Sequence, residues 1–251
     1  MSIFAAFRKE WMELIRNYRL LVVVIVLLFF GLTSPILTKF TPELLNLIPT
    51  GDITIQMPPQ TVINAISQYI KNMQQFGIIL AILLAMGSVA QEKDKGTAAM
   101  MLVKPLSREA FLGAKFLSLA AMFFIALFAA AIAAYYYTML LFEAMNILHW
   151  LILNAFLYVY VLVIVAITLF CSTLTKSQVA AGGIALGLIF IPGSIASLLG
   201  LGKYLPGELI TWGARLMQGD TTASWIALGV SMGLIVVPLV GAWLIFKGQE
   251  L

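Results

Sequence analysis

Long stretches without any charged side chain constrain the fold of this chain more than any other feature. Several of them run for about 20 residues, the length that an α-helix needs to cross the hydrocarbon core of a bilayer. A buried helix of a soluble protein needs a polar face, which these stretches lack. A membrane β-barrel would show short alternating segments instead. We therefore expect an all-α polytopic membrane protein, with one transmembrane domain over residues 1–251.

The composition agrees with a membrane protein and excludes several kinds of site. The chain is 62% hydrophobic and 10% charged, and its mean hydropathy is +1.02. A single cysteine, Cys171, excludes an internal disulfide and argues against a cysteine-ligated metal centre. In a membrane protein the net charge of +4 bears on the orientation of the chain and on contact with lipid head groups. The sequence shows no basic patch with interleaved aromatic residues, so it does not predict a nucleic-acid partner. The first apolar run lacks a small-residue cleavage site, so we expect no cleaved signal peptide.

Six spans are predicted, separated by segments of different character. The expected order is an interfacial helix at 1–19, span 1 at 20–38, an external loop at 39–72, span 2 at 73–90, a cytoplasmic loop at 91–115, span 3 at 116–142, span 4 at 150–171, span 5 at 179–199, an external or re-entrant segment at 201–224 and span 6 at 225–246. Pro192 and Gly193 predict a kink or break in span 5, because proline removes a backbone donor. Pro206 suits the first turn of a short helix over residues 207–217.

The N-terminal segment is amphipathic. Phe7 and Trp11 fall on its apolar helical face, while Arg8 and Lys9 belong to the polar remainder. Such a helix is expected to lie in the membrane interface. It either serves as a simple anchor or contacts a partner protein, and the sequence favours neither.

The distribution of Lys and Arg predicts the orientation. Eleven of these residues lie in the N-terminal helix, the 91–115 loop, the turn at Lys176 and the C-terminal tail, against four in the opposite connections. The positive-inside rule therefore places both termini and the 91–115 loop in the cytoplasm of a cell-membrane protein.

Several activities are disfavoured by residues that the sequence lacks. No predicted span carries a charged residue in its middle, which argues against a proton- or sodium-coupled carrier. The one histidine, His149, lies at the outer end of a span, where an interfacial role is simpler than a catalytic one. No Gly-x-x-x-x-Gly-Lys-Ser/Thr loop occurs, so ATP, if used, must be bound by another chain. Two Gly-x-x-x-Gly pairs, at 183–187 and 229–233, predict close helix packing, within the subunit rather than across a dimer.

The 91–115 loop gathers five of the fifteen Lys and Arg residues between two apolar spans. Thr97 and Ser107 are suited to cap helices, and Pro105 ends the short apolar helix expected between them. Methionine-rich apolar helices suit adaptable docking surfaces. The alternative is that this helix sinks into the interface or packs under the neighbouring spans, and the residues alone leave both open.

Sequence motifs in the loop resemble those of type-2 ABC transporter permeases. They consist of an acid, Gly-Thr, an apolar run, Pro-x-Ser-Arg and the lysine Lys115. The loop residues that carry the resemblance are Glu92, Gly96, Thr97, Met100, Met101, Leu102, Pro105, Ser107 and Arg108. The N-terminal helix, with Phe7, Glu10 and Trp11, is similar to the elbow helix of that family. The C-terminal tail is shorter than the basic tail that the family often shows.

The resemblance implies a transmembrane subunit of an ATP-driven exporter. ATP and magnesium would be bound by a separate ABC ATPase subunit docked on a coupling helix in the loop, and this chain would bind no cofactor. The other implied partners are a second copy or a homologous permease, and membrane lipids. An amphipathic or hydrophobic substrate suits the uncharged spans. Two alternatives stay open: a gradient-driven channel or secondary carrier, and a non-transporting scaffold that recruits a soluble protein.

Overall fold

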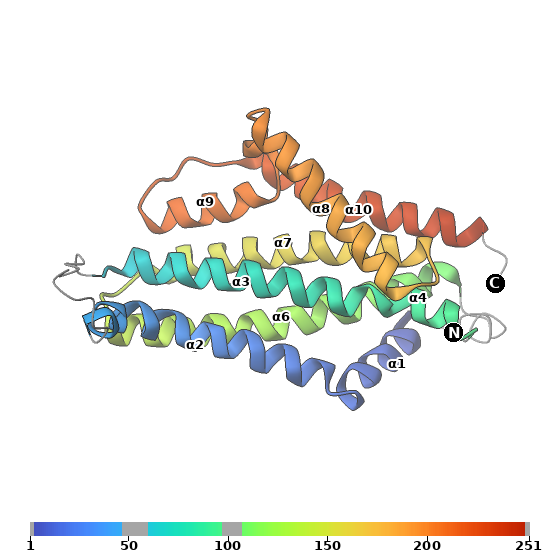
Figure 1. Ribbon diagram of the computed structural model, residues 1–251, viewed down its shortest axis with the longest axis horizontal. Coiled ribbons are helices and arrows are strands. Elements are labelled where there is room, and N and C mark those ends of the chain that lie inside the picture. The colour runs from blue at the N-terminus through green and yellow to red at the C-terminus, as the bar shows by residue number, and fades with distance from the viewer. Residues whose placement is uncertain (1–2, 47–59, 97–106, 249–251) are drawn as a thin grey trace.

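The computed structural model describes residues 3–46, 60–96 and 107–248, and every regular element in these ranges is helical. Figure 1 shows an elongated bundle of long helices lying side by side. The elements are α1 (Ile3–Arg16), α2 (Arg19–Asn46), α3 (Val62–Ala85), α4 (Gly87–Asp94), α6 (Arg108–Leu141), α7 (Ile147–Leu174), α8 (Gln178–Leu198), the 3₁₀ turn η1 (Gly202–Tyr204), α9 (Gly207–Met217) and α10 (Trp225–Gly248).

Six helical segments in the described part of the chain are long and apolar enough to cross a membrane, which confirms the predicted fold class. They are α2, α3 continued by α4, α6, α7, α8 and α10. Several extend beyond the apolar stretches that predicted them. Helix α2 continues through Pro42 to Asn46, and α3 begins at Val62, so both ends of the predicted 39–72 loop are helical. Hydropathy marks where a helix meets lipid, whereas the helix itself continues until a capping signal ends it.

The core of the bundle is formed by α2, α3, α6 and α7. Its largest fully buried side chains include Leu27, Tyr69, Met73, Phe123 and Leu157. Helices α2 and α6 approach most closely where Gly31 faces Ala130. A methyl group on Gly31 would lie 2.8 Å from the backbone oxygen of Ala130, too close for any larger residue without a shift. A small residue at this point allows the backbones to meet, as is common between membrane helices.

Polar side chains join the apolar helices at a few positions. The Tyr69 hydroxyl donates to Asn154 Oδ1 at 2.6 Å, joining α3 to α7. The Trp150 indole donates to the Ala131 carbonyl at 3.2 Å, joining α7 to α6. Asn72 Nδ2 donates to Ser34 Oγ at 2.8 Å, joining α3 to α2. Each bond satisfies polar groups that a bilayer interior would leave without partners.

The interruption between α3 and α4 is held by one serine of α7. Ser172 Oγ accepts from the backbone N–H groups of Val89 and Ala90, at 3.1 and 3.0 Å, and donates to the Met86 carbonyl at 2.8 Å. Ser172 is fully buried. The hydroxyl therefore provides the backbone partners that a continuous helix would otherwise supply.

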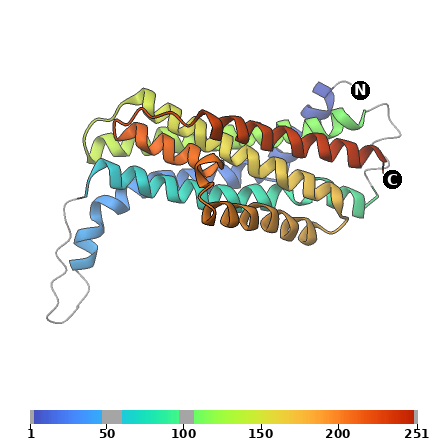
Figure 2. The ribbon, with the colours of Figure 1, turned by 90° about the horizontal axis from the view of Figure 1, so that it is seen from above.

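The segment between the last two spans contains the predicted short helix. Helix α9 runs from Gly207 to Met217, directly after Pro206, as expected. It packs along the N-terminal half of α7 (Figures 1 and 2). A methyl group on Gly213 would meet the Leu153 backbone at 3.1 Å, and the rings of Trp212 and Phe156 lie 4.5 Å apart. One face of α9 is therefore buried against the bundle.

Two sequence predictions about helix α8 and the glycine pairs are wrong. Helix α8 is continuous through Pro192 and Gly193, so the predicted break is absent, and a kink at these residues stays a prediction. Proline removes only one helical hydrogen bond, and in an apolar environment the remaining bonds favour keeping the helix. The glycine pairs at 183–187 and 229–233 do not mediate packing within the subunit. A methyl group on any of these four glycines would meet no atom of another described helix within 4 Å.

Replacing Ser172 by alanine is expected to lower the stability of the bundle. The substitution leaves buried backbone groups at Met86, Val89 and Ala90 without their partner, at a cost of about 2 kcal/mol. Thermal unfolding of the purified protein in detergent measures the effect. Ser88→Ala is the matched control, because the Ser88 hydroxyl bonds only to Leu84 of the preceding turn. Equal shifts in the two variants would contradict this role of Ser172.

Candidate functional site

One end of the bundle brings together segments that are far apart in the sequence. Helix α1, the end of α4, the start of α6 and the end of α10 all lie there, at the right of Figure 1. The opposite end carries the α6–α7 connection and the ends of α2 and α3 that flank residues 47–59. The described sides of the predicted coupling loop, residues 91–96 and 107–115, therefore lie at the same end of the molecule as the predicted elbow helix.

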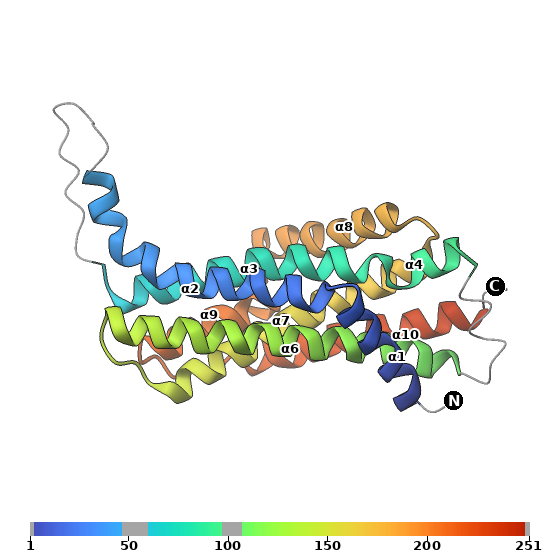
Figure 3. The ribbon, with the colours of Figure 1, turned by 90° about the horizontal axis from the view of Figure 1, so that it is seen from below.

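Helix α1 lies at an angle to the bundle and crosses α6 (Figure 3). Its buried contacts are made by Ala6 and Leu14, and the rings of Phe7 and Trp11 stack 6.0 Å apart. The turn from α1 to α2 places Tyr18 at φ 56°, in the left-handed region that L-residues adopt only rarely. This reversal directs α1 away from the axis of α2 and toward the first turns of α6.

Lys115 of α6 is the centre of an ionic cluster at this end. Its side chain is only 4% exposed, and its Nζ lies 2.7 Å from Glu92 Oε1 and 3.1 Å from Glu10 Oε2. The two carboxylates come from α4 and α1. A buried ammonium is strongly unfavourable unless it is paired and hydrogen-bonded. Lys115 thus requires that three separate segments meet.

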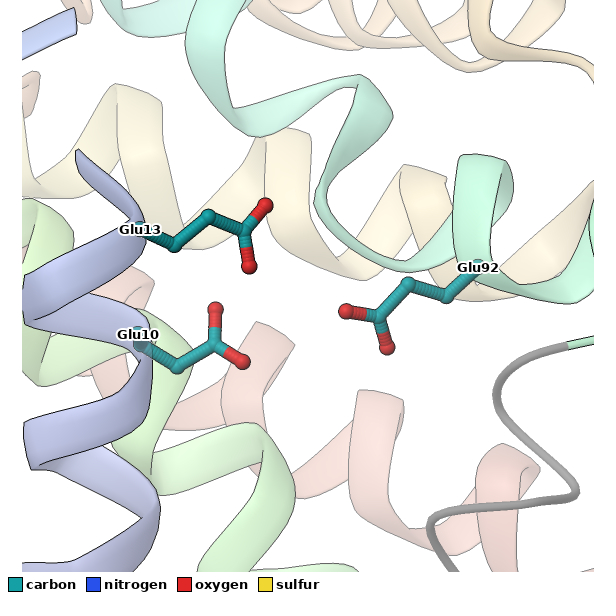
Figure 4. A group of neighbouring side chains, drawn as sticks. All are labelled: Glu10, Glu13 and Glu92. Carbon is teal, nitrogen blue, oxygen red and sulfur yellow. The ribbon is translucent and has the colours of Figure 1, made fainter. Parts of the chain in front are cut away.

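Lys9 and Glu13 of α1 extend the cluster toward solvent. Lys9 Nζ lies 3.1 Å from Glu10 Oε1, 3.7 Å from Glu92 Oε1 and 3.8 Å from Glu13 Oε2. Figure 4 shows the carboxylates of Glu10, Glu13 and Glu92 pointing toward one another, with oxygen atoms within 4.8 Å. Because the ammonium groups of Lys9 and Lys115 pair with these acids, two of the three negative charges are compensated within the cluster. We interpret the cluster as an ion-paired junction.

The charges shift the pKa values of two α1 residues. Burial acts to raise the pKa of Glu10, but the ammonium groups of Lys115 and Lys9 outweigh it, so the pKa of that carboxyl is lowered. Burial likewise acts to lower the pKa of Lys9, and the carboxylates of Glu10, Glu92 and Glu13 overcome it, so its pKa is raised. Both shifts favour the charged forms.

The two ends of the loop are fixed by further contacts. Gly96 follows α4 at φ 67°, a conformation that suits glycine. Ser107 caps α6 by accepting from the Ala110 N–H at 3.2 Å. Arg108 Nη1 donates to the carbonyls of Phe246 and Lys247, at 2.5 and 2.6 Å. These carbonyls belong to the last turn of α10, where a helix leaves acceptors unsatisfied.

The predicted site residues divide into those that the structure places and those that it does not. Phe7, Glu10, Trp11, Glu92, Gly96, Ser107 and Arg108 lie at this end of the bundle, whereas Pro192 and Gly193 lie in α8. Thr97, Met100, Met101, Leu102 and Pro105 lie outside the described residues, so the coupling helix stays a prediction. Sequence reasoning missed the pairing of Lys115 with Glu10 and Glu92. The available signal was a lysine placed where an otherwise apolar helix begins.

Comparison with known proteins identifies a family that this chain matches. The sequence pattern of the ABC-2 family of transporter proteins matches residues 4–251. A relative in Bacillus subtilis (strain 168), described as the uncharacterized transmembrane protein YxlG, is 25% identical over 250 residues. That match covers 97% of this chain and 95% of the relative. The similarity therefore extends over the whole bundle.

Replacing Lys115 by methionine is expected to destabilise the protein by about 3 kcal/mol. The change leaves Glu10 and Glu92 without their buried partner, whereas methionine keeps most of the side-chain volume. The matched change Lys9→Met should cost less than about 1 kcal/mol, since Lys9 is 41% exposed and its pairs are screened by solvent. Thermal unfolding of both variants measures the difference. A Lys9 variant as unstable as the Lys115 variant would show that Lys115 is not the centre.

Acid is expected to release α1 from the bundle. The pKa of Glu10 is lowered in the folded state, so its contribution is present above its ordinary value of 4.5 and is lost as the pH falls through the folded value. The protection of the α1 amides against hydrogen exchange, taken relative to the intrinsic exchange rate at each pH, should therefore fall as the pH drops below 4.5, while the α7 amides remain protected. In Glu10→Gln, α1 should exchange fast at pH 7 already. Unchanged protection of α1 at low pH would contradict the assignment.

Proposed function

The chain belongs to the ABC-2 family of transporter proteins, and on that premise we propose that it is the membrane subunit of an ATP-driven exporter. A separate ABC ATPase subunit would bind ATP and magnesium and dock on the loop over residues 91–108. In this assignment ATP is hydrolysed outside this chain, because its sequence contains no nucleotide-binding loop.

The observation that carries the proposal is the ion pair between Glu92 and Lys115. Glu92 precedes the segment 97–106 and Lys115 follows it, so the 2.7 Å pair joins the two sides of the loop. A loop whose sides are joined moves as one unit when a partner presses on it. This arrangement suits a loop that transmits force, whereas a passive connection needs no such pair.

The same contacts connect the loop to the rest of the bundle. Glu10 brings α1 to the junction, and α1 leads through Tyr18 into α2. Arg108 brings the end of α10 to the start of α6. Closure of a docked ATPase pair would therefore act on α1, α4, α6 and α10 together, as a rigid-body switch requires.

The orientation that we propose places this end in the cytoplasm. The excess of Lys and Arg in its segments supports it, as does the position of α1 and the end of α10 on one side of the bundle. The cell membrane would then be crossed six times, with both termini inside.

A second copy, or a homologous permease, is the partner that we propose within the membrane. The glycine pairs of α8 and α10 contact no other described helix. In the most apolar stretch of each of these helices only 17% is buried, against 50% in α6 and α7. Open small-residue faces allow close helix contact with another chain. A pathway between two such uncharged surfaces suits an amphipathic or hydrophobic substrate.

Reconstitution with a candidate ABC ATPase subunit tests the proposal. The two proteins should copurify, and proteoliposomes containing both should export a hydrophobic fluorescent dye only with ATP. Glu92→Gln should reduce dye export at least about tenfold relative to ATP hydrolysis, because the loop would lose its tie to Lys115. Glu143→Gln, an exposed acid at the opposite end, is the matched control.

Three outcomes would contradict the proposal. Dye flux from this chain alone, driven by a gradient without ATP, would indicate a channel or carrier. Copurification without any ATP-dependent flux would indicate a scaffold. Full coupling in Glu92→Gln would remove the role given to the ion pair.

A further inference from the structure

An apolar groove lies between α1 and α6 on the outer surface of the bundle. It has a volume of about 570 Å³ and is lined by Phe4 and Phe7 of α1, Leu117, Ala121 and Ile125 of α6, and Tyr158 of α7, among others. Phe4 is 72% exposed and Leu117 is 46% exposed, so the described part of the chain leaves both rims uncovered. An uncovered apolar hollow on a membrane-spanning helix faces acyl chains.

A second apolar groove continues along α6 from the first. Its volume is about 720 Å³, and it extends to Leu140 and Ile147 at the far ends of α6 and α7. Phe124 and Tyr158 line both grooves, with their rings in an edge-on contact 5.6 Å apart. This aromatic pair divides the apolar track into a part next to α1 and a part toward the opposite end.

The dimensions of the groove under α1 match one leaflet. Leu117 and Ile125 are eight positions apart, which is about 12 Å at 1.5 Å per residue. One leaflet supplies roughly 15 Å of a bilayer core that is about 30 Å thick. A lipid tail entering beneath α1 would therefore end near the Phe124–Tyr158 pair.

A positively charged residue of α1, Arg8, lies beside this groove. Arg8 follows Phe7 directly and lies one turn from Phe4 on α1, and its side chain is exposed. No acid among the described residues lies within ion-pair distance of Arg8, whereas the neighbouring Lys9 is bound to the carboxylate cluster. An exposed arginine at the membrane surface attracts anionic head groups by about 1 kcal/mol.

We propose that the groove holds an acyl chain of an anionic phospholipid whose phosphate is bound by Arg8. The lipid is a resident of the leaflet next to α1, which is the cytoplasmic leaflet in the orientation proposed above. It completes the packing of α1, whose ionic side pairs with Lys115 and whose apolar side covers the groove. The lipid site does not depend on the ATPase, so it can be tested separately from transport.

Lipid binding to the purified, delipidated chain tests the proposal. Dioleoylphosphatidylglycerol and dioleoylphosphatidylcholine carry the same acyl chains and differ in head-group charge. The wild type should retain phosphatidylglycerol in native mass spectrometry, and this lipid should raise Tm by about 5 °C, more than phosphatidylcholine does. Arg8→Gln should bind the two lipids equally, whereas Arg16→Gln, an exposed arginine further along α1, should keep the preference.

Filling the groove separates this site from general lipid contact. Ala121→Trp should abolish both the retained lipid and the rise in Tm, whereas Ala129→Trp, on α6 but outside both grooves, should leave them unchanged. Leu117→Trp is a second filling variant, and circular dichroism confirms that each variant is folded. Retention of phosphatidylglycerol by a folded filling variant would overturn the site. An unchanged preference in Arg8→Gln would overturn the head-group assignment.

Discussion

The buried ammonium of Lys115 is the constraint on which this end of the structure depends. A lysine that is 4% exposed needs carboxylates at contact distance, and Glu10 of α1 and Glu92 of α4 supply them from two separate segments. Neither α1 nor α4 can provide both, so the three segments hold their positions together. Removing the Lys115 ammonium would leave Glu10 and Glu92 without their buried partner in a poorly solvated place.

Helix α1 depends on this junction because the rest of its contacts are limited. Only Ala6 and Leu14 of α1 are buried, and its apolar side chains at Ile3 and Phe4 remain exposed to the membrane. Its position therefore depends on the charges at Lys115, and the proposed lipid in the groove would add a second support. If the two proposals above hold, a helix supported in this way would respond both to the docked ATPase and to the lipid composition of the leaflet.

Sequence alone predicted the parts of the fold that arise from local rules. Hydropathy gave the number and class of the spans, and Pro206 marked the first turn of α9 correctly. The same local reasoning failed at Pro192, because the remaining helical hydrogen bonds kept α8 continuous despite the one donor that proline lacks. It also failed at the glycine pairs, because spacing alone does not say which surface of a helix faces its neighbours. The link from Lys115 to Glu92 joins residues 23 positions apart, and that to Glu10 joins residues 105 apart. Such pairs are set by tertiary packing, which periodicity and spacing do not encode.

The distribution of burial separates a tightly packed group of helices from two that are packed more loosely. Helices α2, α3, α6 and α7 are joined by the Gly31–Ala130 contact and by the bonds of Tyr69 and Trp150, so they form a unit that resists deformation. Helices α8 and α10 contribute far less buried surface and keep their glycine faces open. A force applied at the loop would reach the rigid unit through Lys115 and α10 through Arg108. The change in shape is then expected where the packing is weakest, along α8 and the outward face of α10, which are the surfaces that a second permease would share.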